Sequence, residues 1–137
     1  MWLGAFLASQ QPLVTLHPSD PLATVIHRLS SVPLSILPVV DGDSRLLGVV
    51  NLEEVHLAAQ TPSLKPLILA EDLMRSDIRP LTSDDTLDRA LELFVENDLL
   101  ALPVVDNLKT RQVIAMVRRF DVASAYLRHI HGPRAPS

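Results

Sequence analysis

The chain has 137 residues, a formal net charge of −4 and no cysteine, and 47% of its residues are apolar. This length supports one domain, or two small half-domains that depend on each other. The lack of cysteine excludes a disulfide framework, a thiol nucleophile and a zinc–thiolate site, and it fits a cytosolic location. No uncharged apolar run approaches the about 18 residues that span a membrane. The apolar excess indicates that some apolar surface meets a partner or a second copy.

Charge is distributed unevenly along the chain. From Lys109 onward there are six Lys or Arg residues and one acid, Asp121, whereas the preceding 108 residues carry six Lys or Arg and fifteen acids. The C-terminal part is therefore the only region that favours an anion, and a solvated basic helix is the alternative explanation. Nucleic acid is not an expected partner, because the remainder is acidic and only five aromatic residues are present.

The first eight residues, MWLGAFLA, are apolar, but no basic residue precedes them, which makes them a poor signal peptide. We assign residues 1–11 as an N-terminal docking segment, followed by a short extended piece over 13–16. Asp20 and Pro21 then predict the start of a helix, with Asp20 as the N-cap and Pro21 at the first helical position. Apolar residues at helical spacing continue this helix to about Ser31.

A short β-branched run comes next and predicts a buried strand. It starts at Pro38, where a missing N–H does no harm. Asp41-Gly42 is typical of a hairpin turn. We therefore expect the chain to return as a strand over 46–50 and to enter a second helix over 52–59.

The segment from Leu16 to Asp41 then recurs. Leu81 to Asp106 aligns with it at a shift of 65 residues without a gap, and both segments end in Leu-Pro-Val-Val-Asp. Two copies are too few for a solenoid, so we expect two similar half-units, related by an approximate two-fold axis, that bury their apolar faces against each other.

Repeat two predicts the same elements, with a turn that is two residues longer. Its first helix has Asp85 as N-cap and ends near Asn97, a residue type that tolerates a left-handed cap. Further elements are a helix between the repeats over 67–74, an extended piece over 78–81, a strand starting at Pro103, a strand over 113–117 and a helix over 119–128. The expected units are 1–11 (docking segment), 12–66 (repeat one with linker), 67–131 (repeat two) and 132–137 (flexible tail). Expected core residues are Ile26, Leu29, Val39, Leu91, Phe94 and Val104.

This order of elements, with Pro-Val-Val-Asp in the middle of each copy, resembles the cystathionine-β-synthase (CBS) domain over about residues 12–129. CBS domains occur as tandem pairs, often called Bateman modules. The resemblance implies an α+β fold, an α/β-type sandwich of two β-α-β-β-α repeats with pseudo-two-fold symmetry. It also implies a regulatory role, because CBS pairs commonly bind adenosine nucleotides between the repeats and pass the occupancy to an attached enzyme, channel or transporter.

The family's usual nucleotide signature, Ser/Thr-x-x-Asp after the third strand, is altered in both copies. Repeat two has Arg118-Arg119-Phe120-Asp121. The resemblance implies that Asp121 accepts hydrogen bonds from ribose, and Arg118 could grip phosphate as a planar fork, with Arg119 and Arg111 nearby. A surface arginine and a helix N-cap are the alternative roles. The residues of this preferred cleft are Pro80, Leu102, Pro103, Arg118, Arg119 and Asp121.

Repeat one has Asn51-Leu52-Glu53-Glu54 at the same place, and its two acids repel phosphate. The residues of this weaker cleft are Val14, Leu37, Pro38, Asn51 and Glu54. No cofactor is required, and AMP, ADP and ATP are the candidate ligands.

The segment from Val113 to His129 is similar to the last CBS helix of chloride channel and transporter family members, including Tyr126 near its end. This similarity implies a transmembrane part as the parent protein and a cytoplasmic location at the inner face of the membrane. Residues 1–8 would then be the point where the tail leaves the membrane part. A stand-alone CBS protein that regulates another enzyme or transporter is the alternative.

Three functional classes follow: a regulatory ligand-sensing module, a ligand-free dimerisation module, and an enzyme. The last is least favoured, because no nucleophile has a neighbouring base and the four glycines form no phosphate loop. No metal site is predicted, although His129 and His131 could share a metal. We expect a homodimer in which the second helices pair between copies through Val122, Ala123 and Ala125.

Overall fold

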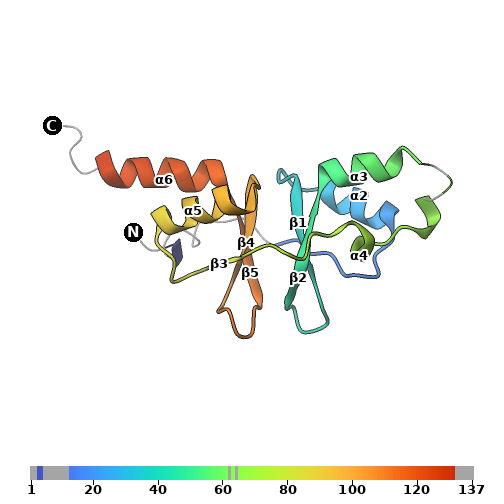
Figure 1. Ribbon diagram of the computed structural model, residues 1–137, viewed down its shortest axis with the longest axis horizontal. Coiled ribbons are helices and arrows are strands. Elements are labelled where there is room, and N and C mark those ends of the chain that lie inside the picture. Colours follow the sequence, from blue (N-terminus) through green and yellow to red (C-terminus); the bar gives the residue numbers. More distant parts are fainter. Residues whose placement is uncertain (1–2, 5–12, 62, 64, 132–137) are drawn as a thin grey trace.

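The computed structural model describes residues 3–4, 13–61, 63 and 65–131. Two similar half-units lie side by side, with their strands meeting at a central seam and their helices on the outside (Figure 1). The elements of repeat one are α2 (Leu22–Ser30), β1 (Ile36–Val40), β2 (Leu46–Asn51) and α3 (Leu52–Ala59). Those of repeat two are β3 (Leu81–Thr82), α5 (Leu87–Asn97), β4 (Ala101–Val105), β5 (Val113–Arg118) and α6 (Arg119–His131). The predicted α+β fold with two related repeats is confirmed.

The two sheets have the same plan. In repeat one, β1 pairs antiparallel with β2, and Leu16 adds a single parallel bridge to Val39. In repeat two, β4 pairs antiparallel with β5, and the equivalent residue, Leu81, pairs parallel with Val104. The extended piece that opens each repeat is therefore present in both, although in repeat one it is reduced to one bridge.

The central strands are buried on both faces, which explains their uninterrupted apolar sequence. Because side chains alternate along a strand, Leu37 and Val39 pack in the cluster of repeat one that includes residues of α2 and α3. Ile36 and Val40 join the cluster formed mainly by repeat two. The core is consequently continuous across the seam.

The expected core is largely confirmed. Leu29, Val39, Phe94 and Val104 are buried. Ile26 and Leu91 are only half-buried at the margins of the two clusters, so their full burial was a wrong prediction.

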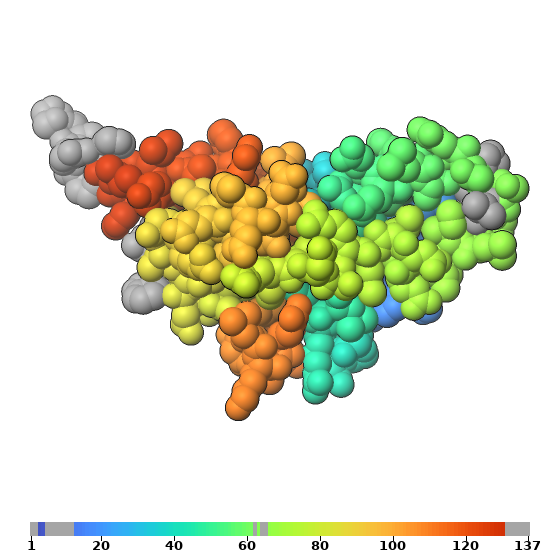
Figure 2. All heavy atoms as spheres, in the orientation of Figure 1, coloured from blue at the N-terminus to red at the C-terminus, as the bar shows by residue number. Residues whose placement is uncertain are grey.

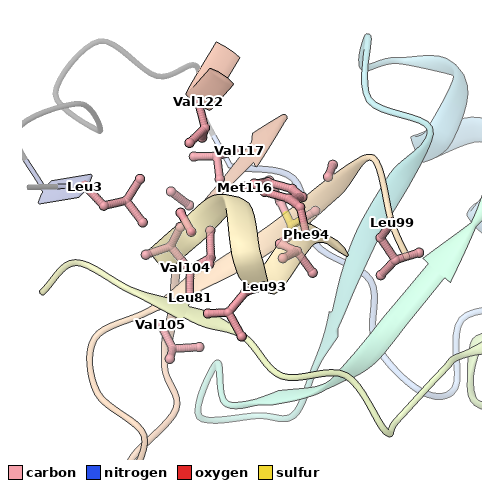
Figure 3. Close-up of a cluster of buried hydrophobic side chains, with 14 of the residues drawn as sticks. Leu3, Leu81, Leu93, Phe94, Leu99, Val104, Val105, Met116, Val117 and Val122 are labelled. Carbon is pink, nitrogen blue, oxygen red and sulfur yellow. The ribbon is translucent and has the colours of Figure 1, made fainter. Parts of the chain in front are cut away.

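Leu3 is buried in the core of repeat two, where Figure 3 shows its side chain pointing into the apolar cluster. Its backbone N–H donates to the Asp85 carbonyl at 2.9 Å. The short helix α4 (Ala70–Leu73) docks on repeat one in the same way, since the Ala70 N–H donates to the Asp20 carbonyl at 2.8 Å. Each repeat is thus covered by a segment that precedes the other. The rest of the predicted docking segment lies outside the described residues.

The helix between the repeats is shorter than predicted. Instead of one helix over 67–74, the chain forms a 3-10 turn, η1 (Lys65–Leu67), and then α4. Ile68 and Leu69 are held out of the helix because the Ile68 carbonyl accepts the Leu22 N–H and Leu69 forms a bridge with Pro21.

Both predicted N-caps are off by one residue. The caps are Pro21 for α2 and Thr86 for α5, and Thr86 accepts the Arg89 N–H through its hydroxyl at 3.3 Å. Asp20 and Asp85 instead accept, at 2.8 Å, the backbone N–H of the residue three positions earlier. Each aspartate therefore closes the turn before the helix.

The predicted hairpins are present, but glycine does not provide their left-handed residue. Gly42 has no positive φ; Ser44 (φ 63°) and its counterpart Arg111 (φ 56°) do. The two hairpin tips also bind each other across the seam, because the Leu46 N–H donates to the Arg111 carbonyl at 2.9 Å and the Val113 N–H donates to the Ser44 carbonyl at 3.0 Å.

The residues named for pairing between copies do not form an outer face. Val122 and Ala125 are buried in the core of repeat two, and only Ala123 is partly exposed. The inward face of α6 was mistaken for its outward face. In the parts of the chain that the structure describes, no helix has the length and apolar character required to cross a membrane.

Candidate functional site

The register of the strands gathers the predicted repeat-two residues at one end of the sheet. Arg118, the last residue of β5, lies opposite Ala101, the first residue of β4. Because Leu81 pairs with Val104 in parallel, Pro80 lies beside Pro103 at the same end. Helix α6 begins directly after Arg118, so its N-terminal end faces this end as well.

Arg118 and Asp121 bind each other at the start of α6. The Arg118 Nε donates to Asp121 Oδ2 at 2.8 Å, and Nη2 donates to Oδ1 at 3.2 Å. The side chains are 47% and 30% exposed, so water screens this ion pair and its opening costs only about 0–1 kcal/mol. The two groups expected to hold phosphate and ribose are therefore adjacent, and each is the hydrogen-bond partner of the other.

Arg119 is a second cationic residue at this end of the sheet. Its backbone N–H donates to the Leu100 carbonyl at 2.8 Å, which fixes the turn into α6. Its side chain is exposed and has no ion-pair partner in the part of the chain that the structure describes. Together with the positive end of the helix macrodipole, it makes this corner attractive to an anion.

The apolar residues of both predicted clefts are largely covered. Leu102 and Leu37 are 0% and 1% exposed, and Pro80, Pro38 and Pro103 are also buried. They shape the strand ends by packing and offer little accessible surface of their own. Val14 is half-buried at the edge of repeat one.

The corresponding end of repeat one has a different chemistry. Asn51 caps α3, because its Oδ1 accepts the Glu53 N–H at 3.1 Å. Glu54 is half-buried, and its Oε2 is inaccessible and has no hydrogen-bond partner. This corner offers carboxylates and no arginine at the positions equivalent to Arg118 and Arg119, so a phosphate is disfavoured there.

Arg111 does not belong to the site. It lies at the tip of the repeat-two hairpin, before the first residue of β5, whereas Arg118 is the last residue of that strand. At about 3.3 Å per strand residue the two positions are roughly 20 Å apart. The prediction that Arg111 lies near the phosphates was wrong, because Arg111 lies before the start of β5 and the site lies at the end of that strand.

Sequence reasoning missed the pairing of Arg118 with Asp121. The signal was present, since residues three apart on a helical turn are neighbours and opposite charges at that spacing attract. Among the described residues, no group of three or more His, Asp or Glu side chains is placed to hold a metal ion.

Comparison with known proteins identifies the family. The model of the CBS domain matches twice, over residues 7–59 and 70–128, which together make up most of the chain. The chain therefore belongs to the CBS domain family, and its two repeats form a CBS-domain pair.

Two curated relatives are enzymes that are much longer than this chain. An inosine-5′-monophosphate dehydrogenase of Methanocaldococcus jannaschii is 29% identical over 69% of this chain and 18% of its own length. A homoserine O-acetyltransferase of Methanohalobium evestigatum is 33% identical over 64% of this chain and 17% of its own length. The chain spans less than a fifth of either relative.

Solved structures have the same fold. CBSX2 in complex with AMP is 27% identical, with a TM-score of 0.75 over 94% of this chain and 98% of that one. The CBS domain pair of protein MJ0100, in complex with 5′-methylthioadenosine and S-adenosyl-L-methionine, has a TM-score of 0.78 at 19% identity and the same coverage. A CBS domain-containing protein of Bacillus anthracis reaches 0.80 at 15% identity, covering 93% and 94% of the two chains.

Proposed function

We propose that this CBS pair is a regulatory module without catalysis of its own that binds an adenosine nucleotide at the repeat-two end of the sheet. The observation that carries the proposal is the placement of Arg118, Arg119 and Asp121 around the first turn of α6. A carboxylate for ribose hydroxyls and two guanidinium groups for phosphates meet there in one exposed corner.

In this proposal, the nucleotide binds by replacing the ion pair between Arg118 and Asp121. A nucleotide offers Arg118 a phosphate and offers Asp121 two hydroxyl donors, so one exposed ion pair is exchanged for two charge-assisted interactions. Opening the pair costs about 0–1 kcal/mol, whereas a hydrogen bond to a charged group contributes roughly 1.5–3 kcal/mol. The balance favours the ligand, and it favours more phosphate because Arg119 has no other partner in the described structure.

The similarity to CBSX2 supports the choice of an adenosine compound. That protein was crystallised with AMP, and at 27% identity it matches nearly the whole of this chain. The altered signature is the reason to expect a different phosphate preference here.

The test is titration calorimetry with adenosine, AMP, ADP and ATP on the full chain and three variants. Arg118→Ala should weaken the phosphorylated ligands at least tenfold, which corresponds to about 1.4 kcal/mol. Asp121→Ala should weaken adenosine and its phosphates alike, because all contain ribose.

The control is Asn51→Ala, which removes the matching helix cap in repeat one and should leave affinity unchanged. Equal losses for Asn51→Ala and Arg118→Ala would place the ligand elsewhere. If no adenosine compound gives heat with the unaltered chain, a ligand-free dimerisation module becomes the better description.

The parent protein is a narrower proposal. The likeness of 113–129 to the CBS tail of chloride channels and transporters supports a cytosolic module at the inner face of the membrane. A stand-alone CBS protein that regulates another enzyme or transporter is the alternative. Co-purification of the endogenous protein with membranes, before and after a carbonate wash, separates the two.

We also propose that the module acts as a homodimer.

A further inference from the structure

We propose that Arg75 is a positioning residue for nucleotide binding in repeat two, although its own backbone is paired with repeat one. It acts through Asn97 on the backbone of Arg79. This inference rests on the proposed function, because it concerns the same binding site. We call that site the repeat-two corner; it is formed by Arg118, Arg119 and Asp121.

The backbone of Arg75 binds to repeat one. Its N–H donates to the Val49 carbonyl at 2.8 Å, and its carbonyl accepts the Val49 N–H at 3.0 Å, which forms an antiparallel bridge with β2. Gly48 makes this approach possible, because a Cβ at that position would lie 2.5 Å from the Arg75 carbonyl oxygen. The place of the Arg75 backbone is therefore set by β2.

The side chain of Arg75 reaches repeat two. Its Nη2 donates to the carbonyl oxygen of Asn97, the last residue of α5, at 3.1 Å. The last four carbonyls of a helix have no partner inside the helix, and that end of the helix attracts cations. The Arg75 Nε also lies 3.7 Å from Asp77 Oδ1, but the Asp77 side chain is 82% exposed, so water screens this ion pair. The contact with α5 is therefore the closer and better shielded of the two.

Asn97 in turn holds the border of the repeat-two corner. Its Oδ1 accepts the Arg79 N–H at 2.8 Å, and its Nδ2 donates to the Arg79 carbonyl at 2.9 Å. The next residue is Pro80, which lies beside Pro103 at the same end of the sheet as Arg118. Because proline has a fixed φ, its placement follows that of the residue before it. A continuous set of hydrogen bonds thus joins β2 to the edge of the corner.

The segment between α4 and β3 joins the two repeats at the seam. In Figure 1 the chain leaves α4, crosses beside β2 and enters β3. Figure 2 shows this crossing segment at the surface between the repeats, above the two hairpins in that view. Arg75 and Arg79 both belong to it, so the segment is held once by repeat one and once by repeat two.

The set of bonds is specific to the repeat-two corner. At a shift of 65 residues, Val32 takes the place of Asn97 and Val14 takes the place of Arg79. A valine side chain has no donor or acceptor, so the border of repeat one cannot be held in this way. The corner that carries the arginines is thus also the corner whose border is held from across the seam.

Loss of the Arg75 guanidinium should loosen this border and weaken every adenosine ligand by the same factor. Titration calorimetry with adenosine and ATP on Arg75→Ala measures the change, and we expect a loss of about three- to tenfold for both ligands. The loss is shared because Arg75 donates to a backbone carbonyl and not to a phosphate. Arg75→Lys keeps a cationic donor and should restore most of the affinity. Arg89→Ala is the control, since it removes an arginine of α5 whose ion pair with Glu92 lies at the surface, and it should leave affinity unchanged.

A second variant perturbs the same contact while keeping every polar group. Gly48→Ala adds a Cβ that must displace the Arg75 backbone, so it should weaken both ligands without changing a charge or a donor. Gly42→Ala is its matched control, because an added Cβ there meets nothing within 4 Å beyond its chain neighbours, and affinity should not change. Urea denaturation of each variant establishes that it is folded.

A double-mutant cycle tests whether Arg75 acts through Asn97. In Asn97→Leu the backbone of Arg79 has lost its partners, so adding Arg75→Ala should cause no further loss of affinity. Additive losses would contradict a role of Asn97 as the intermediate.

The outcomes separate this inference from the proposed function. If the unaltered chain binds adenosine compounds and both Arg75→Ala and Gly48→Ala bind them equally well, the inference is overturned and the proposed site stands. A loss confined to ATP would make Arg75 a direct phosphate ligand and would also overturn it. If the unaltered chain binds no adenosine compound, both proposals fail together.

Discussion

At the scale of single residues, Asn97 is a buried polar residue in the described structure. It is 6% exposed, yet its amide is satisfied: Nδ2 donates to the carbonyls of Arg79 at 2.9 Å and Leu93 at 2.8 Å, and Oδ1 accepts the Arg79 N–H at 2.8 Å. It ties the end of α5 to the segment that precedes β3. The equivalent position in repeat one is Val32, so this clamp exists only once.

Replacing Asn97 with Leu should lower the free energy of unfolding by about 2–4 kcal/mol, because the backbone groups of Arg79 lose their buried partners. Urea denaturation measures the change. Asn97→Asp keeps one acceptor and should cost a similar amount, since it loses both donors and introduces a charge. A loss below about 0.5 kcal/mol for Asn97→Leu would mean that water replaces the amide.

Residue-level roles were the hardest to predict from sequence. Asn97 was expected near a left-handed cap, but the left-handed residue is Asp98 (φ 55°), because the Asn97 side chain is needed inside. Sequence identifies residue types that suit a cap, whereas the exact position depends on which neighbour the chain must reach.

At the scale of elements, the aspartate that ends each Pro-Val-Val-Asp run organises the hairpin. Asp41 Oδ1 accepts the N–H groups of Asp43 at 2.8 Å and Arg45 at 3.0 Å. Asp106 Oδ1 accepts the N–H groups of Asn107 at 2.7 Å and Gln112 at 2.9 Å. The recurring motif is therefore a buried strand followed by its own turn-closing carboxylate.

These bonds predict a dependence of stability on pH. The Arg45 backbone N–H lowers the pKa of Asp41, and the Thr110 hydroxyl, with backbone N–H groups, lowers that of Asp106, each from an ordinary value of 3.8. The unfolded chain therefore binds more protons just below pH 4, so this stabilisation is present above that pH and is lost as pH falls through the folded pKa values.

Urea denaturation between pH 7 and pH 2.5 measures this dependence. The variant with both Asp41→Asn and Asp106→Asn should lose less stability over the acidic range than the unaltered chain. Asp43→Asn is the control, because it removes a charge from the same turn without removing the accepting carboxylate. An unchanged acidic slope in the double variant would contradict the prediction.

Elements were predictable where periodicity was strong. The helix over 52–59 was predicted with its observed bounds, and the returning strands differ by one residue at their ends. The prediction of one helix over 67–74 was wrong, because pairing with the start of α2 overrides the helical propensity of this segment. The local sequence contains no pattern that indicates this contact.

At the scale of the whole molecule, the repeat in the sequence was sufficient to predict a paired arrangement with a shared core. It could not decide which face of α6 points outward, because Val122 and Ala123 are adjacent apolar residues and only packing against α5 distinguishes them. Nor could it show that the hairpin tips bind across the seam, since two of those bonds join backbone groups and the third is donated by the Gln112 Nε2 to the Asp43 carbonyl at 3.2 Å.

The shared core makes one further prediction. Ile36, Val40, Leu46 and Val49 of repeat one belong to the same cluster as Phe94 of repeat two, so the halves should unfold together. Phe94→Ala should lower the free energy of unfolding by about 3–5 kcal/mol by leaving a cavity. Calorimetry should still give one transition whose calorimetric and van't Hoff enthalpies agree.

Val95→Ala, at a neighbouring side chain that is 78% exposed, is the matched control and should have little effect. A second transition that keeps its original temperature in Phe94→Ala would mean that repeat one folds by itself, and the seam would then join two independent units.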